Sequence, residues 1–315
     1  MSKIAFVFPG QGSQKTGMGL EIYKATETAK QVFADADKTL GYALSQLCFE
    51  GPEEQLRLTK NTQPAILTTS IALWKVLDEQ LDRTPDFVAG HSLGEYSALV
   101  AAGSLSFADA VLTVHKRGTY MEEAVPAGEG AMSAVMNLDR DKLVEICKEV
   151  SHQGHVVEPA NFNSPNQIVI SGHQAAVKEA GEKALEAGAR RVIPLSVSGP
   201  FHSSLMQPAA DRLADHLASV PIREADVPVV ANATAQGVAD SEAIQQLLVQ
   251  QVASPVLWED SVRYMLEEGV TVFVEIGAGN VLSGLIKKVD RKVKTLSVQD
   301  PESLKQAVET LQSLK

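Results

Sequence analysis

In this 315-residue sequence, a serine flanked by glycines is the feature that most clearly indicates a reactive side chain. Ser92 is the central residue of Gly90–Gly94, which matches the G-x-S-x-G pattern that places a nucleophilic serine on a sharp turn between a strand and a helix. The apolar run 87–89 predicts the strand, and residues 93–102 predict the helix, which Gly103 ends. Free N–H groups at a helix start favour negative charge that develops near them. The alternative is that Ser92 only caps the helix.

A nucleophilic serine needs a base, and two of the seven histidines are candidates for that role. His202 lies in a loop after Gly199-Pro200, where the chain is predicted to return to its larger domain. His91 is next to Ser92, but its side chain points to the opposite side if the turn is strand-like. We therefore favour His202 as the base; the alternative is a structural histidine.

Arg117 is the third candidate, because it lies on an apolar helix face. The S-x-x-D pattern of residues 106–109 predicts a capped helix start, and Ala110, Val114, Arg117 and Met121 then share one face. An arginine keeps its proton, so its burial is costly without an anionic partner. The sequence leaves three readings open: a structural salt bridge, a guanidinium that reaches solvent, or a cleft arginine that binds a substrate carboxylate through two parallel bonds.

The elements that position these residues alternate between strands and helices. Strands are predicted at 3–8, 87–89, 229–232 and 270–276, and Asn61–Pro64 is predicted to start a buried helix. From residue 131 to 196 the order is β-α-β-β-α-β, with a helix at 140–150, which is the ferredoxin-like arrangement. We therefore expect an α/β fold with a hydrolase-like parallel-sheet domain, discontinuous over residues 1–127 and 198–315, and an inserted small ferredoxin-like domain at 128–197.

Composition narrows the class of protein. Hydrophobic residues make up 44% and charged residues 21%, which is typical of an ordered globular chain, and the net charge of −11 argues against general nucleic-acid binding. Cys48 and Cys147 have no disulfide or metal spacing, and the apolar run 4–8 is too short for a signal peptide or a membrane span. We expect a cytoplasmic protein with no nucleic-acid, membrane or metal partner.

A basic cluster contrasts with the acidic chain. It follows Gly277-Ala278-Gly279, which is predicted to open a helix, and consists of Lys287, Lys288, Arg291, Lys292 and Lys294. Such a cluster is usually a solvated face, and the alternative is a docking surface for an acidic partner.

Four motifs together resemble the malonyl-CoA:acyl carrier protein transacylases, which are similar to the acyltransferase domains of polyketide synthases. In the family's order along nearly the whole chain, they are Phe8–Gln14, Thr62–Ala65, Gly90–Tyr96 and Gly199–His202. The resemblance implies that Ser92 is the nucleophile and His202 its base, in a dyad without an aspartate.

The resemblance also implies roles for further residues. Gln251 falls in the region that orients the histidine through a main-chain carbonyl and a glutamine, and the N–H groups of Gln11 and Leu93 would form an oxyanion hole. In the acyl pocket, the resemblance assigns the malonyl carboxylate to Arg117, the pocket wall to Met121, a preference for malonyl over methylmalonyl to Phe201, and positions near the cleft to Asn161 and Asn163.

The activity that the resemblance implies is ping-pong transfer of malonyl from malonyl-CoA to the phosphopantetheine thiol of acyl carrier protein, in fatty acid or polyketide synthesis. CoA thioester is a substrate, no cofactor is expected, and the family is usually monomeric. The carrier protein would dock at Lys287, Lys288 and Arg291 or at Arg190 and Arg191.

Two other classes of protein are left open. A serine esterase or thioesterase would normally carry an acidic residue between its serine and a late histidine, together with an HGGG-like loop. His202 is mid-chain and no HGGG occurs. The second class is a non-catalytic module that docks carrier protein, and intact Ser92, His202 and Arg117 argue against it.

Overall fold

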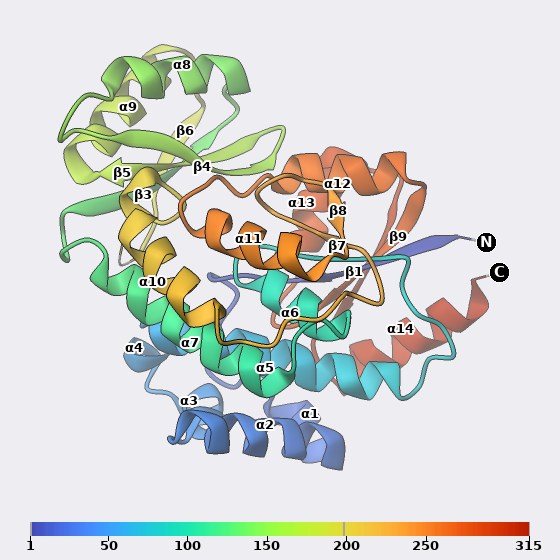
Figure 1. The fold of residues 1–315 in the computed structure, drawn as a ribbon. Coiled ribbons are helices and arrows are strands. Elements are labelled where there is room, and N and C mark those ends of the chain that lie inside the picture. The colour runs from blue at the N-terminus through green and yellow to red at the C-terminus, as the bar shows by residue number, and fades with distance from the viewer. Residues whose placement is uncertain (1, 198, 315) are drawn as a thin grey trace.

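Two β-sheets organise residues 2–197 and 199–314, which are the residues that this computed structural model describes (Figure 1). The larger sheet has the strand order β10-β9-β1-β2-β7-β8. Neighbouring strands from β10 to β7 are parallel, and β8 pairs antiparallel with β7. The strands are β1 (Lys3–Phe8), β2 (Phe87–Gly90), β7 (Val229–Val230), β8 (Gly237–Val238), β9 (Val270–Ile276) and β10 (Lys294–Val298). The expected α/β fold is confirmed.

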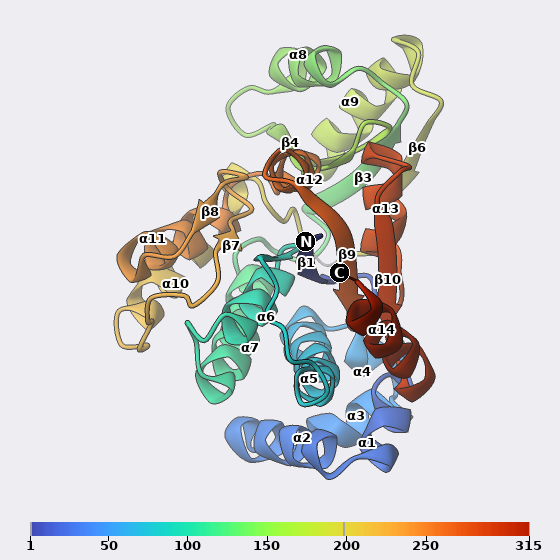
Figure 2. The ribbon, with the colours of Figure 1, turned by 90° about the vertical axis from the view of Figure 1, so that its right-hand side faces the viewer.

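Strand β1 lies inside the sheet and is covered on both faces, which explains its unbroken apolar sequence. Phe6 and Val7 point to opposite faces because side chains alternate along a strand. Phe6 shares a core with helices on one face, and Val7 shares a core with helices on the other (Figure 2). The first group comprises α5 (Thr59–Asp78), α6 (Gly94–Ala101) and α7 (Phe107–Glu123), and the second comprises α12 (Trp258–Glu267) and α13 (Val281–Val289).

The remaining helices extend the outer layer of the larger sheet. Helices α1 to α3 lie beyond α5, on the side away from the sheet (Figure 2). These outer elements are α1 (Leu20–Ala25), α2 (Glu27–Leu40), α3 (Leu44–Glu50), α4 (Glu53–Leu56), the short 3₁₀ helix η1 (Ser204–Met206), α10 (Gln207–Leu217), α11 (Ser241–Val252) and α14 (Pro301–Ser313).

Helix α5 begins earlier than the sequence predicts. Its first residue is Thr59, so the predicted start at Asn61 is wrong and Pro64 lies inside the helix. A proline has no N–H, so the carbonyl of Lys60 loses its usual helical donor. His115 Nδ1 lies 2.8 Å from that carbonyl oxygen and replaces the missing donor. A side chain of α7 therefore compensates the proline in α5, and the two helices pack together.

The smaller sheet has the predicted ferredoxin-like order. Its strands pair antiparallel as β4-β5-β3-β6, and α8 and α9 cover the face turned away from the larger sheet (Figure 1). The elements are β3 (Gly130–Met136), α8 (Arg140–Val150), β4 (Val157–Ser164), β5 (Gln167–His173), α9 (Gln174–Glu186) and β6 (Arg191–Pro194). The division into domains at 127/128 and 197/198 stays a prediction, and residue 198 lies outside the described residues.

Strand β4 ties the smaller sheet to the rest of the molecule. Val256 donates to the carbonyl of Ala160, and Phe162 donates to the carbonyl of Val256. Nearby, Arg140 Nη1 lies 2.9 Å from both carboxylate oxygens of Asp260. These bonds fix the edge strand that carries Asn161 against the larger part of the fold.

The described residues also bear on membrane and metal binding. Among them, no helix is long and apolar enough to cross a membrane. No group of three or more His, Cys, Asp or Glu side chains in this part of the chain could hold a metal ion. Cys48 and Cys147 are both buried free thiols.

Candidate active site

Ser92 occupies the turn between β2 and α6 in a strained conformation. Its φ of 53° is left-handed, which residues other than glycine rarely adopt, and its N–H donates to Asn232 Oδ1 at 2.7 Å. Both flanking glycines are required: a Cβ on Gly90 would lie 1.9 Å from the carbonyl carbon of Gly94, and a Cβ on Gly94 would lie 2.2 Å from a backbone oxygen of β1. The predicted strand, turn and helix are confirmed. The cap of α6 is Leu93, so the alternative that Ser92 caps the helix is wrong.

His202 approaches Ser92 from the loop before η1. Its φ is 58°, its Nε2 lies 2.8 Å from Ser92 Oγ, and its Nδ1 lies 2.9 Å from the backbone oxygen of Gln251. A carbonyl only accepts hydrogen bonds, so Nδ1 carries the proton and Nε2 offers its lone pair to the serine hydroxyl. Burial, followed by the positive charge of Arg117, lowers the pKa of His202 to about 3. The imidazole is therefore neutral and oriented as a base for Ser92.

Arg117 lies on the same buried site, with 1% of its surface exposed. Its Nη1 donates to Gln63 Oε1 at 2.8 Å, and its Nη2 donates to Gln251 Oε1 at 3.0 Å and to Ser92 Oγ at 3.1 Å. Burial lowers its pKa from the ordinary arginine value. Within the described ranges Arg117 forms no ion pair, and its head does not reach solvent. The described residues therefore support neither the structural salt bridge nor the guanidinium that reaches solvent, and binding of a substrate carboxylate by Arg117 stays a prediction.

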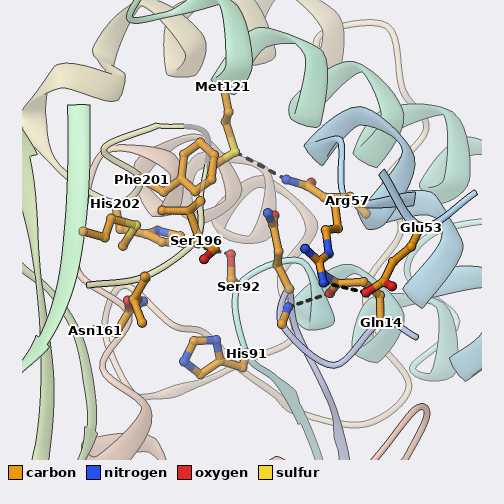
Figure 3. A pocket seen from close by; sticks show the side chains of 16 residues that line it. Gln14, Glu53, Arg57, His91, Ser92, Met121, Asn161, Ser196, Phe201 and His202 are labelled. Atoms are coloured by element: carbon orange, nitrogen blue, oxygen red, sulfur yellow. Dashed lines mark hydrogen bonds and ion pairs between the residues drawn. The ribbon is translucent and has the colours of Figure 1, made fainter. Parts of the chain in front are cut away.

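Ser92 and His202 border a cavity of about 440 Å³ (Figure 3). Arg117 lies behind the cavity wall, hydrogen-bonded to the lining residues Ser92 and Gln63. Ser92 and His202 lie together at that wall, while Met121 and Phe201 form an apolar side. Glu53 and Arg57 lie at another side and form an ion pair of 2.6 Å. The remaining lining residues include Gln11, Gly12, Gln14, Gln63, His91, Met132, Asn161, Leu195, Ser196 and Val197. A serine and a neutral base therefore face one cavity, and a buried cation bonds to the serine from behind the wall.

A family model and the similar known proteins assign this chain to the same kind of protein. A model described as "Acyl transferase domain" matches residues 5–306. The malonyl CoA-acyl carrier protein transacylase of Bacillus subtilis (strain 168) is 55% identical over 311 residues, which cover 99% of this chain and 98% of that protein. The chain belongs to the malonyl CoA-acyl carrier protein transacylase family. The resemblance inferred from its motifs is confirmed.

Solved structures of the transacylase family have the same fold. The malonyl CoA-acyl carrier protein transacylase of Coxiella burnetii is 43% identical and superimposes with a TM-score of 0.96, over 98% of both chains. A second structure, in which a malonyl-transacylase is in complex with a type II PKS acyl-carrier protein, is 46% identical with a TM-score of 0.95, over 98% of this chain and 100% of that one.

The two backbone donors that the family resemblance assigns to an oxyanion hole lie at the site. Gln11 lines the cavity, and Leu93 follows Ser92 directly at the start of α6. Among the hydrogen bonds of residues 2–197 and 199–314, none has the N–H of Gln11 or Leu93 as its donor. Both groups are therefore available to a substrate oxygen, and their role stays a prediction.

Of the residues that the resemblance assigns to the acyl pocket or its vicinity, some line the cavity and one does not. Met121 and Asn161 line the cavity and are buried. Asn163 does not line it; its Oδ1 lies 2.7 Å from Nε2 of His91, and both residues border a smaller neighbouring cavity of about 160 Å³. Asn161 is therefore at the cavity wall, Asn163 lies behind His91, and a substrate contact by either residue stays a prediction.

Three buried residues of the site were not singled out from the sequence. Gln63 contacts Arg117, and Asn232 contacts Ser92. Glu95 accepts from the N–H of Asn232 and from Gln251 Nε2, each at 2.9 Å, and burial raises its pKa to about 7. Gln63 and Glu95 lie within the quoted motifs, which was the available signal. Asn232 only ends a predicted strand, which gave no sign of a role.

Proposed function

We propose that this chain transfers a malonyl group from malonyl-CoA to the phosphopantetheine thiol of acyl carrier protein, through a malonyl ester of Ser92. The observation that carries the proposal is the 3.1 Å contact between Arg117 Nη2 and Ser92 Oγ. A buried cation beside the nucleophile suits an acyl group that itself bears a carboxylate. The names of the relatives, and the complex of a similar transacylase with its carrier protein, support the donor and the acceptor.

In the first half-reaction, Ser92 Oγ attacks the thioester carbonyl carbon while its proton passes to His202 Nε2. Negative charge develops on the carbonyl oxygen and is stabilised by the N–H groups of Gln11 and Leu93. The tetrahedral intermediate then collapses and the C–S bond breaks. His202 gives its proton to the departing CoA sulfur, and a malonyl ester of Ser92 is left.

In the second half-reaction, the phosphopantetheine thiol attacks the ester carbonyl and passes its proton to His202 Nε2. The same two N–H groups stabilise the second tetrahedral intermediate. When the C–O bond breaks, the proton returns to Ser92 Oγ, and the carrier protein leaves with the malonyl thioester. The enzyme is then back in its starting state.

The acyl group would be held by its carboxylate and by an apolar wall. Arg117 would bind the carboxylate, and Met121 and Phe201 would pack against the short carbon chain. Asn161 would contact the polar part of the thioester from the smaller sheet. Enclosure by both sheets would limit the access of water to the ester, which favours transfer over hydrolysis.

We assign docking of the acidic carrier to two sets of exposed basic residues. Arg190 and Arg191 are exposed and precede residues 195–197, which line the cavity that Ser92 borders. Lys288 and Arg291 are exposed near α13, whose first turn borders the neighbouring cavity. Lys287 contributes less, because its Nζ bonds to the carbonyl of Val293 within its own loop.

The proposal also covers the location of the protein in the cell, its oligomeric state and its pathway. The chain would act in the cytoplasm, which suits two buried free thiols. It would act as a monomer in fatty acid or polyketide synthesis. In the described part of the chain the exposed large apolar side chains are scattered, as on a monomer surface: Leu185, Ile193 and Val281.

Intact mass after brief incubation with malonyl-CoA, followed by addition of carrier protein, tests the proposed function. A malonyl adduct on the wild type that is absent from Ser92→Ala, and that discharges to the carrier, is expected. Free CoA without an accumulating adduct would favour a thioesterase. No adduct and no CoA would favour a docking module. A label that persists on Ser92→Ala would refute Ser92 as the nucleophile.

A further inference from the structure

Arg117 carries a buried positive charge, yet its hydrogen-bond partners in the described part of the chain are all neutral. They are the amide oxygens of Gln63 and Gln251 and the hydroxyl of Ser92. Its Nε is buried and has no hydrogen-bond partner among those residues. Because desolvation of a cation is costly, a buried arginine normally contacts an anion. This guanidinium is held in place without being neutralised by contact.

The carboxyl group that lies nearest in the network does not contact Arg117 directly. Glu95 accepts hydrogen bonds from Asn232 N and Gln251 Nε2, so its oxygen faces those donors. Gln251 then lies between Glu95 and Arg117, with its Nε2 toward Glu95 and its Oε1 toward the guanidinium. The hydrogen bonds that fix Arg117 therefore come from neutral groups, and the carboxyl group of Glu95 is separated from it by Gln251. The guanidinium also lies over the neutral ring of Tyr96, 5.7 Å from its centroid.

Chemistry fixes the orientation of the Gln63 amide. A guanidinium has only donors, so the oxygen of Gln63 must face Arg117 Nη1, at 2.8 Å. Its Nε2 then lies 3.6 Å from the Sδ of Met121, a weak acceptor, as the dashed line at Met121 in Figure 3 marks. Arg117 and Met121 are one turn apart on α7, so Gln63 reaches from α5 across both. Only 1% of Gln63 is exposed, so the amide has little freedom to turn.

We infer that Gln63 is a positioning residue that determines specificity: it aims Arg117 at the substrate carboxylate and leaves the guanidinium charge unpaired. The inference rests on the proposed function, because it takes the malonyl carboxylate as the anionic partner. A glutamate at this position would have the same shape and place the same oxygen against Nη1. It would also pair with Arg117 in the free enzyme, and the substrate would then have to displace it.

The test compares Gln63→Glu and Gln63→Met with the full-length wild type, using malonyl-CoA and acetyl-CoA. The measurement is kcat/KM for formation of the acyl-enzyme, followed by intact mass. We expect Gln63→Glu to lower the malonyl-to-acetyl ratio roughly 10- to 100-fold, since hydrogen bonds to charged groups contribute energies of that order. Gln63→Met removes the aiming oxygen without adding a charge, so the ratio falls by a smaller factor.

A merely structural role predicts equal losses for malonyl-CoA and acetyl-CoA and an unchanged ratio. The losses would be larger in Gln63→Met, because glutamate keeps the shape and the hydrogen bond while methionine loses the bond. An unchanged ratio in Gln63→Glu, or a smaller fall than in Gln63→Met, overturns the inference. If circular dichroism shows that Gln63→Glu fails to fold, Gln63→Met decides: a lowered ratio supports the inference and an unchanged one overturns it. Failure of the proposed function is distinguishable, because the wild type itself would then form no malonyl adduct.

Discussion

Arg117 Nη2 donates to Ser92 Oγ at 3.1 Å, and the same oxygen lies 2.8 Å from Nε2 of His202. The hydroxyl therefore accepts a hydrogen bond from a cation and donates its own proton to a neutral imidazole. Its orientation is set before substrate arrives, and the cation favours the negative charge that the oxygen gains as its proton passes to His202. The nucleophile and the proposed carboxylate site form one hydrogen-bonded unit.

Removal of the Arg117 side chain should affect malonyl transfer more than acetyl transfer. In Arg117→Ala we expect kcat/KM for malonyl-CoA to fall roughly 10- to 100-fold relative to acetyl-CoA, because acetyl has no carboxylate to lose. Arg57→Ala is the matched control, since Arg57 lines the cavity that Ser92 borders but is exposed and paired with Glu53. Equal losses for both donors in Arg117→Ala would make Arg117 a support for Ser92 alone.

Asn232 should contribute to stability and to both half-reactions. Its Oδ1 accepts from the N–H of Ser92, and its Nδ2 donates to the carbonyl of Gly90 at 2.7 Å. Asn232→Ala leaves these buried groups unpaired, so we expect a loss of about 2–3 kcal/mol in the free energy of unfolding. We also expect slower acylation by malonyl and acetyl alike. Urea denaturation measures the first effect, with the exposed Asn166→Ala as control. Wild-type stability and rate in Asn232→Ala would contradict the role.

The acylation rate should not decline through the ordinary histidine range. His202 must be neutral to accept the proton, and burial together with the charge of Arg117 lowers its pKa to about 3. The base therefore stays competent as the pH falls from 7 to about 5, whereas a pKa near 6.5 would cost about tenfold per unit below it. Single-turnover rates of malonyl-Ser92 formation measure this.

Glu95 provides the control for that pH profile, because burial raises its pKa to about 7. An inflection near neutral pH that is absent from Glu95→Gln belongs to Glu95. A tenfold decline per unit below about pH 6.5 that persists in Glu95→Gln would show that His202 titrates normally, contrary to the expectation.

Charge reversal should locate the carrier-protein surface. We expect Arg190→Glu/Arg191→Glu or Lys288→Glu/Arg291→Glu to raise the apparent KM for carrier protein several-fold and to leave the KM for malonyl-CoA unchanged. Lys178→Glu, on the exposed face of α9, is the control for general charge effects. An unchanged carrier KM in both double variants would place docking elsewhere.

Local patterns in the sequence were sufficient for much of the fold. Helix 140–150 and strand 270–276 have the bounds that periodicity and apolar runs predict. The start of α5 was predicted two residues late, because Pro64 was taken as a first-turn residue. The donor that makes a proline tolerable there, His115, comes from another helix, and no local signal announces it.

The sequence by itself pointed to Ser92 as the candidate nucleophile, because glycines at fixed spacing around it indicate the backbone conformation of one turn. It also showed Arg117 on an apolar helix face, since helical spacing is a local property. Folding brings His202 to Ser92 across 110 positions and Gln251 to Ser92 across 159. Only the tertiary structure shows that the hydrogen-bond partners of the Arg117 guanidinium are neutral. Hydrogen-bond partners of buried groups depend on which helices and strands pack together, and that is a property of the whole fold.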